Sequence, residues 1–401
     1  MDTIISLLGI CVFLLIGYTC SSNKTSINFR TVFGAFLIQV LIGAITLYST
    51  IGISALNYLS NGISSILDNA QNGIEFVFGE VGAFELGFIF AFHVLPIIVF
   101  FSSLVSILYH IGIMGWLVKI IGGVIQKFLN TTKAESMAAA ANIFVGQTEA
   151  PLMIRPYINT MTRSELAAVM IGGFATAAGG VLAIYAKWLD TIPGIAGHLM
   201  SASVMSAPAA LVVAKIMFPE TNYSSNEEVN LNEENPSANA MDALGNGTIV
   251  GLRLAVNVGA MLISFISIIA LLNYFLGLFG FSIETILGSI FKPLAWSMGI
   301  PWSESSAVGS LMGKKIVFTE FVAFADLKSL IDSDLISERA AIIASYALCG
   351  FANFGSIGIQ LGGIGGIAPK RRKEIAQLIF KAMIGGAIAS WLTATLAGIL
   401  L

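Results

Sequence analysis

Long apolar stretches separated by short polar segments run along the whole chain. A helix that crosses the hydrocarbon core of a bilayer needs about 20 predominantly apolar residues, and eight stretches come near this length. The predicted spans are Thr3–Cys20, Val32–Ile51, Leu86–Leu108, Leu166–Ala186, Ile192–Phe218, Thr248–Leu276, Ala340–Ile367 and Ile375–Leu400. The pattern predicts an all-α polytopic membrane protein. Because Asp2 stands where a signal peptide would be basic, we expect the first span to be retained.

Two further apolar segments, Ala134–Thr160 and Pro301–Phe324, are interrupted by Glu, Gln, Asn, Pro and Gly. Each is predicted to form a re-entrant helical hairpin, because irregular backbone at membrane depth is tolerated only against protein or water. The span after each hairpin carries a similar glycine break, Gly173–Thr176 in one and Gly350–Asn353 in the other. The order hairpin, broken span, plain span thus occurs twice in opposite orientations, which predicts an inverted repeat with broken helices.

This pattern divides the chain into five predicted parts. Weakly amphipathic stretches at Trp116–Leu129 and Ile283–Leu294 are expected to lie in the membrane interface. The parts are 1–133, a scaffold of spans one to three with interfacial helices; 134–218, the first transport repeat; 219–247, a polar linker; 248–300, scaffold span six with an interfacial helix; and 301–401, the second transport repeat.

Composition and charge agree with a membrane protein and orient it. The 401 residues are 56% hydrophobic and only 11% charged, against about 25% charged in soluble domains. Basic residues gather in the first loop, at Lys24 and Arg30, and in the last loop, at 370–373, whereas Asn57–Glu85 holds only acidic charge. Under the positive-inside rule the basic loops are cytoplasmic and both termini lie outside. The sequence has no run of basic residues that would suggest binding to nucleic acid.

Two glutamates lie inside the predicted hairpins, Glu149 in the first and Glu320 in the second. A charged side chain at the bilayer centre costs about 2.5–3.5 kcal/mol or more, so such residues usually mark a polar pathway. The alternative is that each forms a structural ion pair with a nearby basic residue. The candidates are Arg155 and Arg163 for Glu149, and Lys314 and Lys315 for Glu320.

The first glutamate follows two other polar residues, so that Gln147, Thr148 and Glu149 are consecutive at an expected backbone break. The Gln side chain offers both a donor and an acceptor, and the carboxylate is a strong acceptor. This set would suit a planar ligand with amide edges.

The second repeat holds a set of a different kind, Glu320, Asn353 and Ser356, which would suit several hydroxyls. Asn353 and Ser356 are three residues apart and would share a helix face if this turn is helical. Phe351 adds a flat apolar surface. An aromatic base joined to a polyhydroxyl ring would use both sets, which describes a nucleoside.

A cation site is also predicted where the first hairpin break and the first span break could meet. Hard cations prefer oxygen ligands, and unwound backbone exposes carbonyls. The residues at these two breaks are Asn142, Val145, Thr148, Thr176 and Ala177.

Three sequence strings resemble the concentrative nucleoside transporter family: Ala141–Leu152 (ANIFVGQTEAPL), Leu348–Asn353 (LCGFAN) and Leu361–Gly365 (LGGIG). The likeness runs over nearly the whole chain and is greatest to short bacterial members with eight spans. It implies a multi-pass protein of the bacterial inner membrane, a homotrimer, an elevator-type moving domain and cation-coupled uptake of nucleosides such as uridine.

The resemblance also implies roles for individual residues. Position 176 is often serine in such proteins, and threonine keeps the hydroxyl, so the pattern is similar to the sodium-coupled kind. The implied contacts are Gln147, Thr148 and Glu149 to the nucleobase; Glu320, Asn353 and Ser356 to the ribose; Val181, Leu254 and Phe351 packed on the ligand; and Asn142, Val145, Thr148, Thr176 and Ala177 to the co-transported sodium ion.

Other functions remain open from the sequence. The nearest alternative is a proton-coupled nucleoside symporter or a related carrier of another small metabolite. An intramembrane enzyme would need a nucleophile or metal set near the two glutamates, and neither His nor Cys clusters there. A passive channel would need no paired hairpins. Accumulation against a gradient would exclude both an enzyme and a channel.

Overall fold

The computed structural model describes residues 2–83, 89–93, 95–129, 131–222 and 237–401, and every regular element within them is helical. The first helices are α1 (Asp2–Thr19), α2 (Phe29–Tyr48), α3 (Thr50–Phe78), α4 (Phe90–His93), α5 (Leu95–His110) and α6 (Ile113–Leu129). The middle helices are α7 (Lys133–Ala141), α8 (Glu149–Met153), α9 (Arg155–Ile158), α10 (Arg163–Ala175), α11 (Gly179–Trp188) and α12 (Ile195–Met217). The last are α13 (Ala240–Gly277), α14 (Ile283–Ser297), α15 (Ser305–Val317), α16 (Glu320–Asp332), α17 (Glu338–Leu348), α18 (Phe354–Ile367) and α19 (Arg372–Leu400).

Helix α2 shows how the sequence sorts its residues between the outside and the inside. Every fourth residue from Phe29 to Ile45 is a large apolar side chain that is exposed. Every fourth residue from Thr31 to Gly43 is small or polar, and all of these are buried. Small residues let membrane helices approach closely, while large apolar ones face lipid. The helix is therefore built for an apolar surrounding rather than for water.

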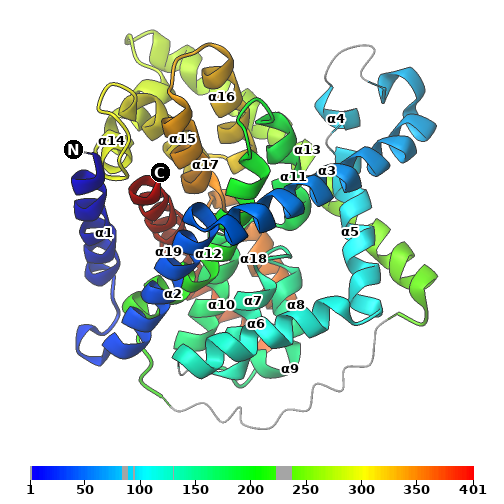
Figure 1. Ribbon diagram of the computed structural model, residues 1–401, viewed down its shortest axis with the longest axis vertical. Coiled ribbons are helices and arrows are strands. Elements are labelled where there is room, and N and C mark those ends of the chain that lie inside the picture. The colour runs from blue at the N-terminus through cyan, green and yellow to red at the C-terminus, as the bar shows by residue number, and fades with distance from the viewer. Residues whose placement is uncertain (1, 84–88, 94, 130, 223–236) are drawn as a thin grey trace.

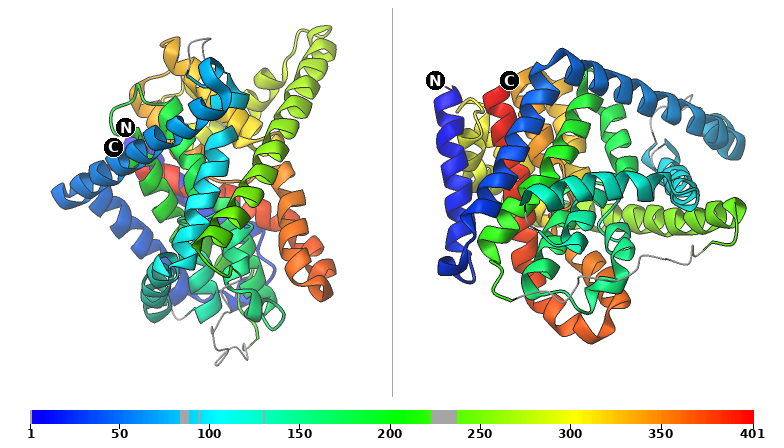
Figure 2. Two further views of the ribbon diagram at one scale, coloured as in Figure 1. Left: turned by 90° about the vertical axis from the view of Figure 1, so that its right-hand side faces the viewer. Right: turned by 60° about the horizontal axis from the view of Figure 1, so that its bottom comes forward.

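A bundle of α10, α12, α17 and α19 forms the centre of the molecule, and α1 and α2 pack against it. Close approach depends on small residues. A Cβ atom at Gly386 of α19 would lie 2.3 Å from the Cβ of Phe174 in α10, so no larger residue fits there. The two ends of the chain lie side by side in all three views of the ribbon (Figures 1 and 2).

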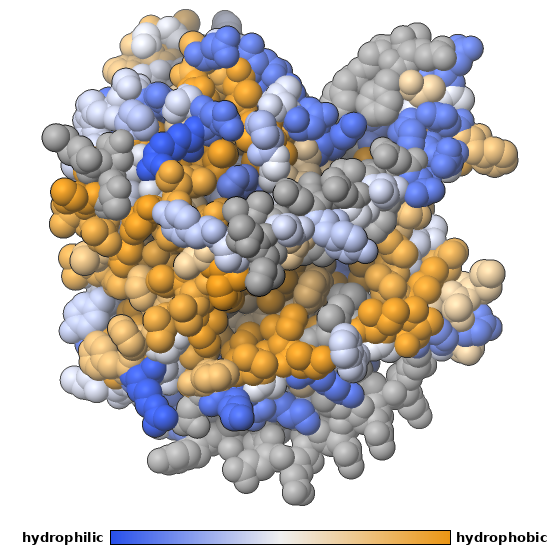
Figure 3. Space-filling view, in the orientation of Figure 1, coloured by the Kyte–Doolittle hydropathy of each residue, from blue (hydrophilic) through white to orange (hydrophobic). Residues whose placement is uncertain are grey.

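Apolar residues gather in a band across the middle of the face in Figure 3, with hydrophilic residues above and below it. In the part of the chain that the structure describes, four helices are long and apolar enough to cross a membrane. They are Phe29–Tyr48, Ala91–His110, Ile195–Met217 and Pro369–Leu400. Two of the other predicted spans are divided by short breaks, at 176–178 into α10 and α11 and at 349–353 into α17 and α18.

Several boundaries differ from those predicted. The second hairpin was expected to end at Phe324, but α16 continues to Asp332, because polar residues such as Asp326 find partners there. Helix α13 begins at Ala240, before the predicted start at Thr248, because Asn239 caps it by accepting a hydrogen bond from the amide of Asp242. Residues 86–88 and 94 of the third predicted span lie outside the described residues.

Candidate functional site

The first candidate element is the break between α7 and α8. Helix α7 ends at Ala141, and Glu149 is the first residue of α8. The carbonyl of Phe144 in this break accepts a hydrogen bond of 3.1 Å from the amide of Gly179, the first residue of α11. The hairpin break and the span break that were expected to meet do so.

The second repeat builds its polar groups from helix caps. Thr319 caps α16, in which Glu320 is the first residue. Asn353 caps α18, and its Oδ1 accepts a hydrogen bond of 2.7 Å from the amide of Ser356. Asn353 and Ser356 were expected to share a helix face if this turn is helical. The condition is not met, because Asn353 precedes the helix, where an Asn side chain satisfies a free amide of the first turn.

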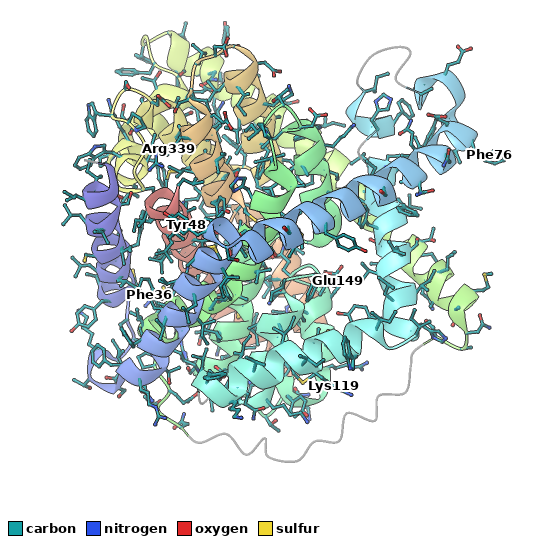
Figure 4. The ribbon with its side chains drawn as sticks, viewed as in Figure 1. Phe36, Tyr48, Phe76, Lys119, Glu149 and Arg339 are labelled. Atoms are coloured by element: carbon teal, nitrogen blue, oxygen red, sulfur yellow. The ribbon has the colours of Figure 1, made fainter. Side chains whose placement is uncertain are left out.

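A cavity opens between the two hairpins and the two broken helices. Figure 4 labels Glu149 near the middle of the molecule, away from its outer edge. The residues that line the cavity are Gly146, Gln147, Thr148, Glu149, Ala178, Val181, Thr319, Glu320, Phe321, Phe351, Asn353, Gly355, Ser356 and Ile359. The structure thus brings together all of the predicted base and ribose residues with two of the three predicted packing residues. The side chain of the third, Leu254 on α13, lies outside the described residues.

Hydrogen bonds join the two polar sets across the repeats. The Nε2 of Gln147 donates to Ser356 Oγ at 3.0 Å, and the Nδ2 of Asn353 donates to Glu320 Oε2 at 2.7 Å. Gln147 is 5% exposed, and its Oε1 has no hydrogen-bond partner within the described structure. Leaving such an acceptor unpaired costs about 1–3 kcal/mol. A ligand that donates a hydrogen bond here would remove that cost.

None of the four basic residues considered as partners forms an ion pair with either glutamate, and Lys315 donates instead to the carbonyl of Ala347 at 2.9 Å. Arg155 and Arg163 are exposed. Lys314 forms ion pairs of 3.0 Å with Glu284 and 2.5 Å with Asp326. No ion pair within 4.0 Å between described residues includes Glu149 or Glu320. A structural ion pair therefore does not explain either carboxylate.

Two residues near the cavity were not found from the sequence. The hydroxyl of Tyr185 donates to Glu320 Oε1 at 3.4 Å, and its ring stacks on Phe324 with 3.9 Å between centroids. The buried Gln360 donates through Nε2 to the carbonyl of Met170 at 3.1 Å. Tyr185 follows Val181 by four residues and Gln360 follows Ser356 by four. The i, i+4 spacing of helices was a signal that could have found both.

The predicted cation ligands lie beside this cavity, at the two breaks of the first repeat. Asn142 is 1% exposed, and neither its Oδ1 nor its Nδ2 has a hydrogen-bond partner among the described residues. Thr176 Oγ1 donates to the carbonyl of Gly172 at 2.9 Å, which leaves its lone pairs as acceptors. Val145 and Ala177 are buried at the same breaks, and only Thr148 also lines the cavity. These oxygen-bearing groups fit a hard cation, because the unpaired Asn142 Oδ1 could serve as a ligand.

Comparisons with known proteins show the family to which the chain belongs. Family models described as "Na+ dependent nucleoside transporter C-terminus" and "Na+ dependent nucleoside transporter N-terminus" match residues 198–398 and 8–81. A third, "Nucleoside recognition", matches residues 91–191. "Nucleoside permease NupC" of Helicobacter pylori is 42% identical over 415 residues, which cover 99% of this chain and 98% of that protein. The chain belongs to the concentrative nucleoside transporter family.

Other members of the concentrative nucleoside transporter family extend the comparison. "Sodium/nucleoside cotransporter 2" of Rattus norvegicus is 38% identical, and the match covers 100% of this chain and 63% of that protein. The structure of CNTnw in an inward-facing substrate-bound state matches with a TM-score of 0.94 at 45% identity, covering 100% of this chain and 98% of that one. A doubly substituted CNTnw in an outward-facing state matches with a TM-score of 0.93 at 44% identity and the same coverage. Since the homologues are nucleoside transporters, this chain is a transporter rather than an enzyme.

Proposed function

We propose that this protein is a secondary active transporter that couples the entry of nucleosides such as uridine to the entry of sodium ions. The observation that carries the proposal is the cavity in which both hairpin tips and the second broken span present polar side chains, while the first broken span adds the apolar Ala178 and Val181. In it, Gln147, Thr148 and Glu149 bind the nucleobase, and Glu320, Asn353 and Ser356 bind the ribose. Phe351, Val181 and Leu254 pack on the ligand.

The unpaired acceptor of Gln147 supports the base assignment, because the amide N–H of a nucleobase would complete its hydrogen bonding. For the ribose, Glu320 has a carboxylate that accepts from Asn353 and Tyr185 and still offers further lone pairs. A hydroxyl bound there would be recognised by a group that is already held in place. Preorganisation of this kind reduces the cost of binding.

Sodium is proposed to bind at Asn142, Val145, Thr148, Thr176 and Ala177. The unpaired side chain of Asn142 supports this site, as do the family models and relatives named for sodium-dependent transport. Thr148 belongs to both proposed sites, so occupation of one would favour the other. Such coupling is reciprocal: sodium raises the affinity for nucleoside as much as nucleoside raises that for sodium.

In the proposed topology, eight spans and two re-entrant hairpins form an inverted repeat in a bacterial inner membrane, with both termini outside. Three copies assemble, and the hairpins move with the broken helices as an elevator. The existence of inward- and outward-facing structures of a relative supports alternating access.

The proposal is tested by uptake of labelled uridine into proteoliposomes that hold the purified protein. An inward sodium gradient at fixed pH should drive accumulation above the external concentration, and a sodium ionophore should abolish it. A proton gradient without sodium is the matched control. Accumulation that follows the proton gradient and ignores sodium would defeat sodium coupling in favour of proton coupling. Equilibration without accumulation would defeat active transport.

A further inference from the structure

The two repeats place different positive groups at the carboxyl end of the first half of their broken span. In each repeat the first half of the broken span, α10 or α17, ends at the break, where the last carbonyls have no helical partner. The carboxyl end of a helix carries about half a negative charge and attracts cations. In the first repeat the proposed sodium ligands lie at this end. In the second repeat, a buried lysine reaches it.

That lysine is Lys315, in the last turn of α15. It is 0% exposed, and its Nζ donates a hydrogen bond of 2.9 Å to the carbonyl of Ala347, in the last turn of α17. The break that follows α17 leads to Asn353, whose Nδ2 donates to Glu320 Oε2 at 2.7 Å. An ammonium group is costly to bury unless charge and hydrogen bonds compensate it. Here the carbonyl at the helix end supplies part of that compensation.

We propose that Lys315 is a built-in cation, which takes the place in the second repeat that a transported cation takes in the first. It is a positioning residue: it fixes the end of α17, and through Asn353 it keeps Glu320 correctly placed for the ribose hydroxyls, as sodium in the first repeat would order Gln147 and Glu149. The inference rests on the proposed function and extends it to a residue that does not line the cavity.

The geometry of the hairpins agrees with this reading. The first hairpin unwinds over the whole of 142–148, which opens space and exposes carbonyls, whereas the second is interrupted only at Phe318 and Thr319. A compact break leaves less room for a free ion. In the second repeat the positive charge is carried by the side chain of Lys315 instead.

The neighbouring lysine supplies a matched control. Lys314 lies one residue earlier on α15, but it points to a different set of partners, Glu284 and Asp326. It is also largely buried. A change at Lys314 therefore removes a positive charge from the same hairpin without touching the end of α17.

The experiment uses the purified full-length protein in detergent, with uridine and 2′,3′-dideoxyuridine as probes. Binding is measured over a series of sodium concentrations at constant ionic strength. Lys315→Gln keeps a donor for the carbonyl of Ala347 but removes the charge, and Lys315→Arg keeps the charge. Lys315→Ala leaves a space at the helix end. Lys314→Gln is the control.

Lys315→Gln should weaken uridine binding about tenfold or more, as expected for a buried charged group that loses its partner. The ratio of uridine to dideoxyuridine affinity should fall with it, because the defect acts through Glu320. Lys315→Arg and Lys314→Gln should keep the wild-type ratio. In Lys315→Ala, the plot of log affinity against log sodium concentration should be steeper than in wild type, because a second ion enters the vacated place.

An unchanged ratio in Lys315→Gln, or an equal loss for both probes, would overturn the positioning role. An unchanged sodium slope in Lys315→Ala would overturn the equivalence to a transported cation. If Lys315→Gln does not fold, a lowered ratio in Lys315→Arg would count against the proposal, since the charge is retained. A wild-type protein that binds neither uridine nor sodium would instead defeat the proposed function itself.

Discussion

Glu149 and Glu320 occupy the same position in their respective repeats. Each follows a threonine, and each is the first residue of a helix. The amino end of a helix favours negative charge by about 0.3–1 kcal/mol, and both carboxylates stand at such an end. The two differ in their surroundings. Glu320 accepts hydrogen bonds from Asn353 and Tyr185, whereas Glu149 accepts one from Thr148 and is half-buried at the cavity.

The proposed role of the Glu149 carboxylate in binding the nucleobase can be tested with the substitution Glu149→Gln. The substitution keeps the size of the side chain but replaces the carboxylate that accepts from the base in the proposed site. We expect nucleoside binding to weaken by about 1–3 kcal/mol, as when a buried polar group loses its partner. Isothermal titration of the purified variant with uridine at saturating sodium measures this. An affinity equal to that of wild type would remove Glu149 from the base site.

The ribose assignment predicts how free bases compete. A site that hydrogen-bonds substrate hydroxyls rejects analogues that lack them, because its own buried groups are left unpaired. Uracil should therefore compete with labelled uridine far less well than unlabelled uridine does, and 2′-deoxyuridine should lie between them. Competition binding to the wild-type protein measures the order. Equal competition by uracil and uridine would exclude Glu320, Asn353 and Ser356 as hydroxyl ligands.

The sodium assignment is tested at Thr176. Thr176→Val keeps the shape of the side chain and removes the hydroxyl, whereas Thr176→Ser keeps the hydroxyl. We expect the valine variant to need more sodium for half-maximal uridine binding, by a factor of about ten for each 1.4 kcal/mol lost. Affinity at saturating sodium should change less, and the serine variant should behave as wild type. A valine variant with an unaltered sodium requirement would contradict the assignment.

At the scale of elements, the two broken helices are joined at their breaks. The hydroxyl of Ser390 in α19 lies 3.0 Å from the carbonyl of Cys349 and 3.4 Å from that of Ala175, the last residue of α10. Gly350 has φ of +135°, and a Cβ there would lie 2.7 Å from the carbonyl oxygen of Ala175. The crossing of the two spans thus depends on the lack of a side chain at Gly350.

Gly350→Ala should therefore destabilise the fold. The added methyl group meets backbone, which cannot move aside as a side chain can, and its φ is one that L residues rarely adopt. A loss of about 1–3 kcal/mol follows from such a backbone conflict. Thermal unfolding in detergent measures it as a lower Tm. Gly358→Ala on α18 is the control, because a Cβ there meets nothing within 4 Å and alanine favours a helix.

Sequence patterns predicted these elements well where a break interrupts an apolar run. Gly173–Thr176 and Gly350–Asn353 stood out because glycine and polar residues are unusual in such runs, and both helices end within or beside them. Tyr185 was missed because a tyrosine in an apolar helix resembles a packing residue; its bond to Glu320 spans 135 positions of sequence. The proposed role of Lys315 could not be predicted either, because it depends on a contact with the carbonyl of Ala347, 32 positions later in the sequence.

At the scale of the whole molecule, the packing bears on which helices move together. Spans one to three and six were predicted to form the scaffold. Helices α5 and α13 form a pair, whereas α1 and α2 pack against α12 and α19. Thr46 of α2 lies 2.7 Å from Ser201 of α12, between their side-chain oxygens. We infer that α1 and α2 travel with the transport repeats, while α5 and α13 stay in place.

Thiol cross-links distinguish the two groupings. In a background without Cys11, Cys20 and Cys349, cysteines at Thr46 and Ser201 should link α2 to α12 without stopping uridine uptake. Cysteines at Tyr109 of α5 and Met153 of α8, whose native hydroxyl and sulfur are 2.8 Å apart, should stop uptake when linked by a bifunctional reagent long enough to replace the two side chains. Reduction should restore it. If linking positions 46 and 201 abolished uptake, α2 would belong to the scaffold and not to the moving part.

The buried amide of Gln39 has a consequence for biosynthesis. Its Nε2 donates to Thr393 Oγ1 at 3.1 Å, across 354 positions of sequence. At a synthesis rate of about 5–20 residues per second, Thr393 leaves the ribosome roughly 18–70 s after Gln39. During that time the amide waits in the membrane without its final partner. A chain that ended before α19 would keep this defect permanently, which would mark truncated products for quality-control proteolysis.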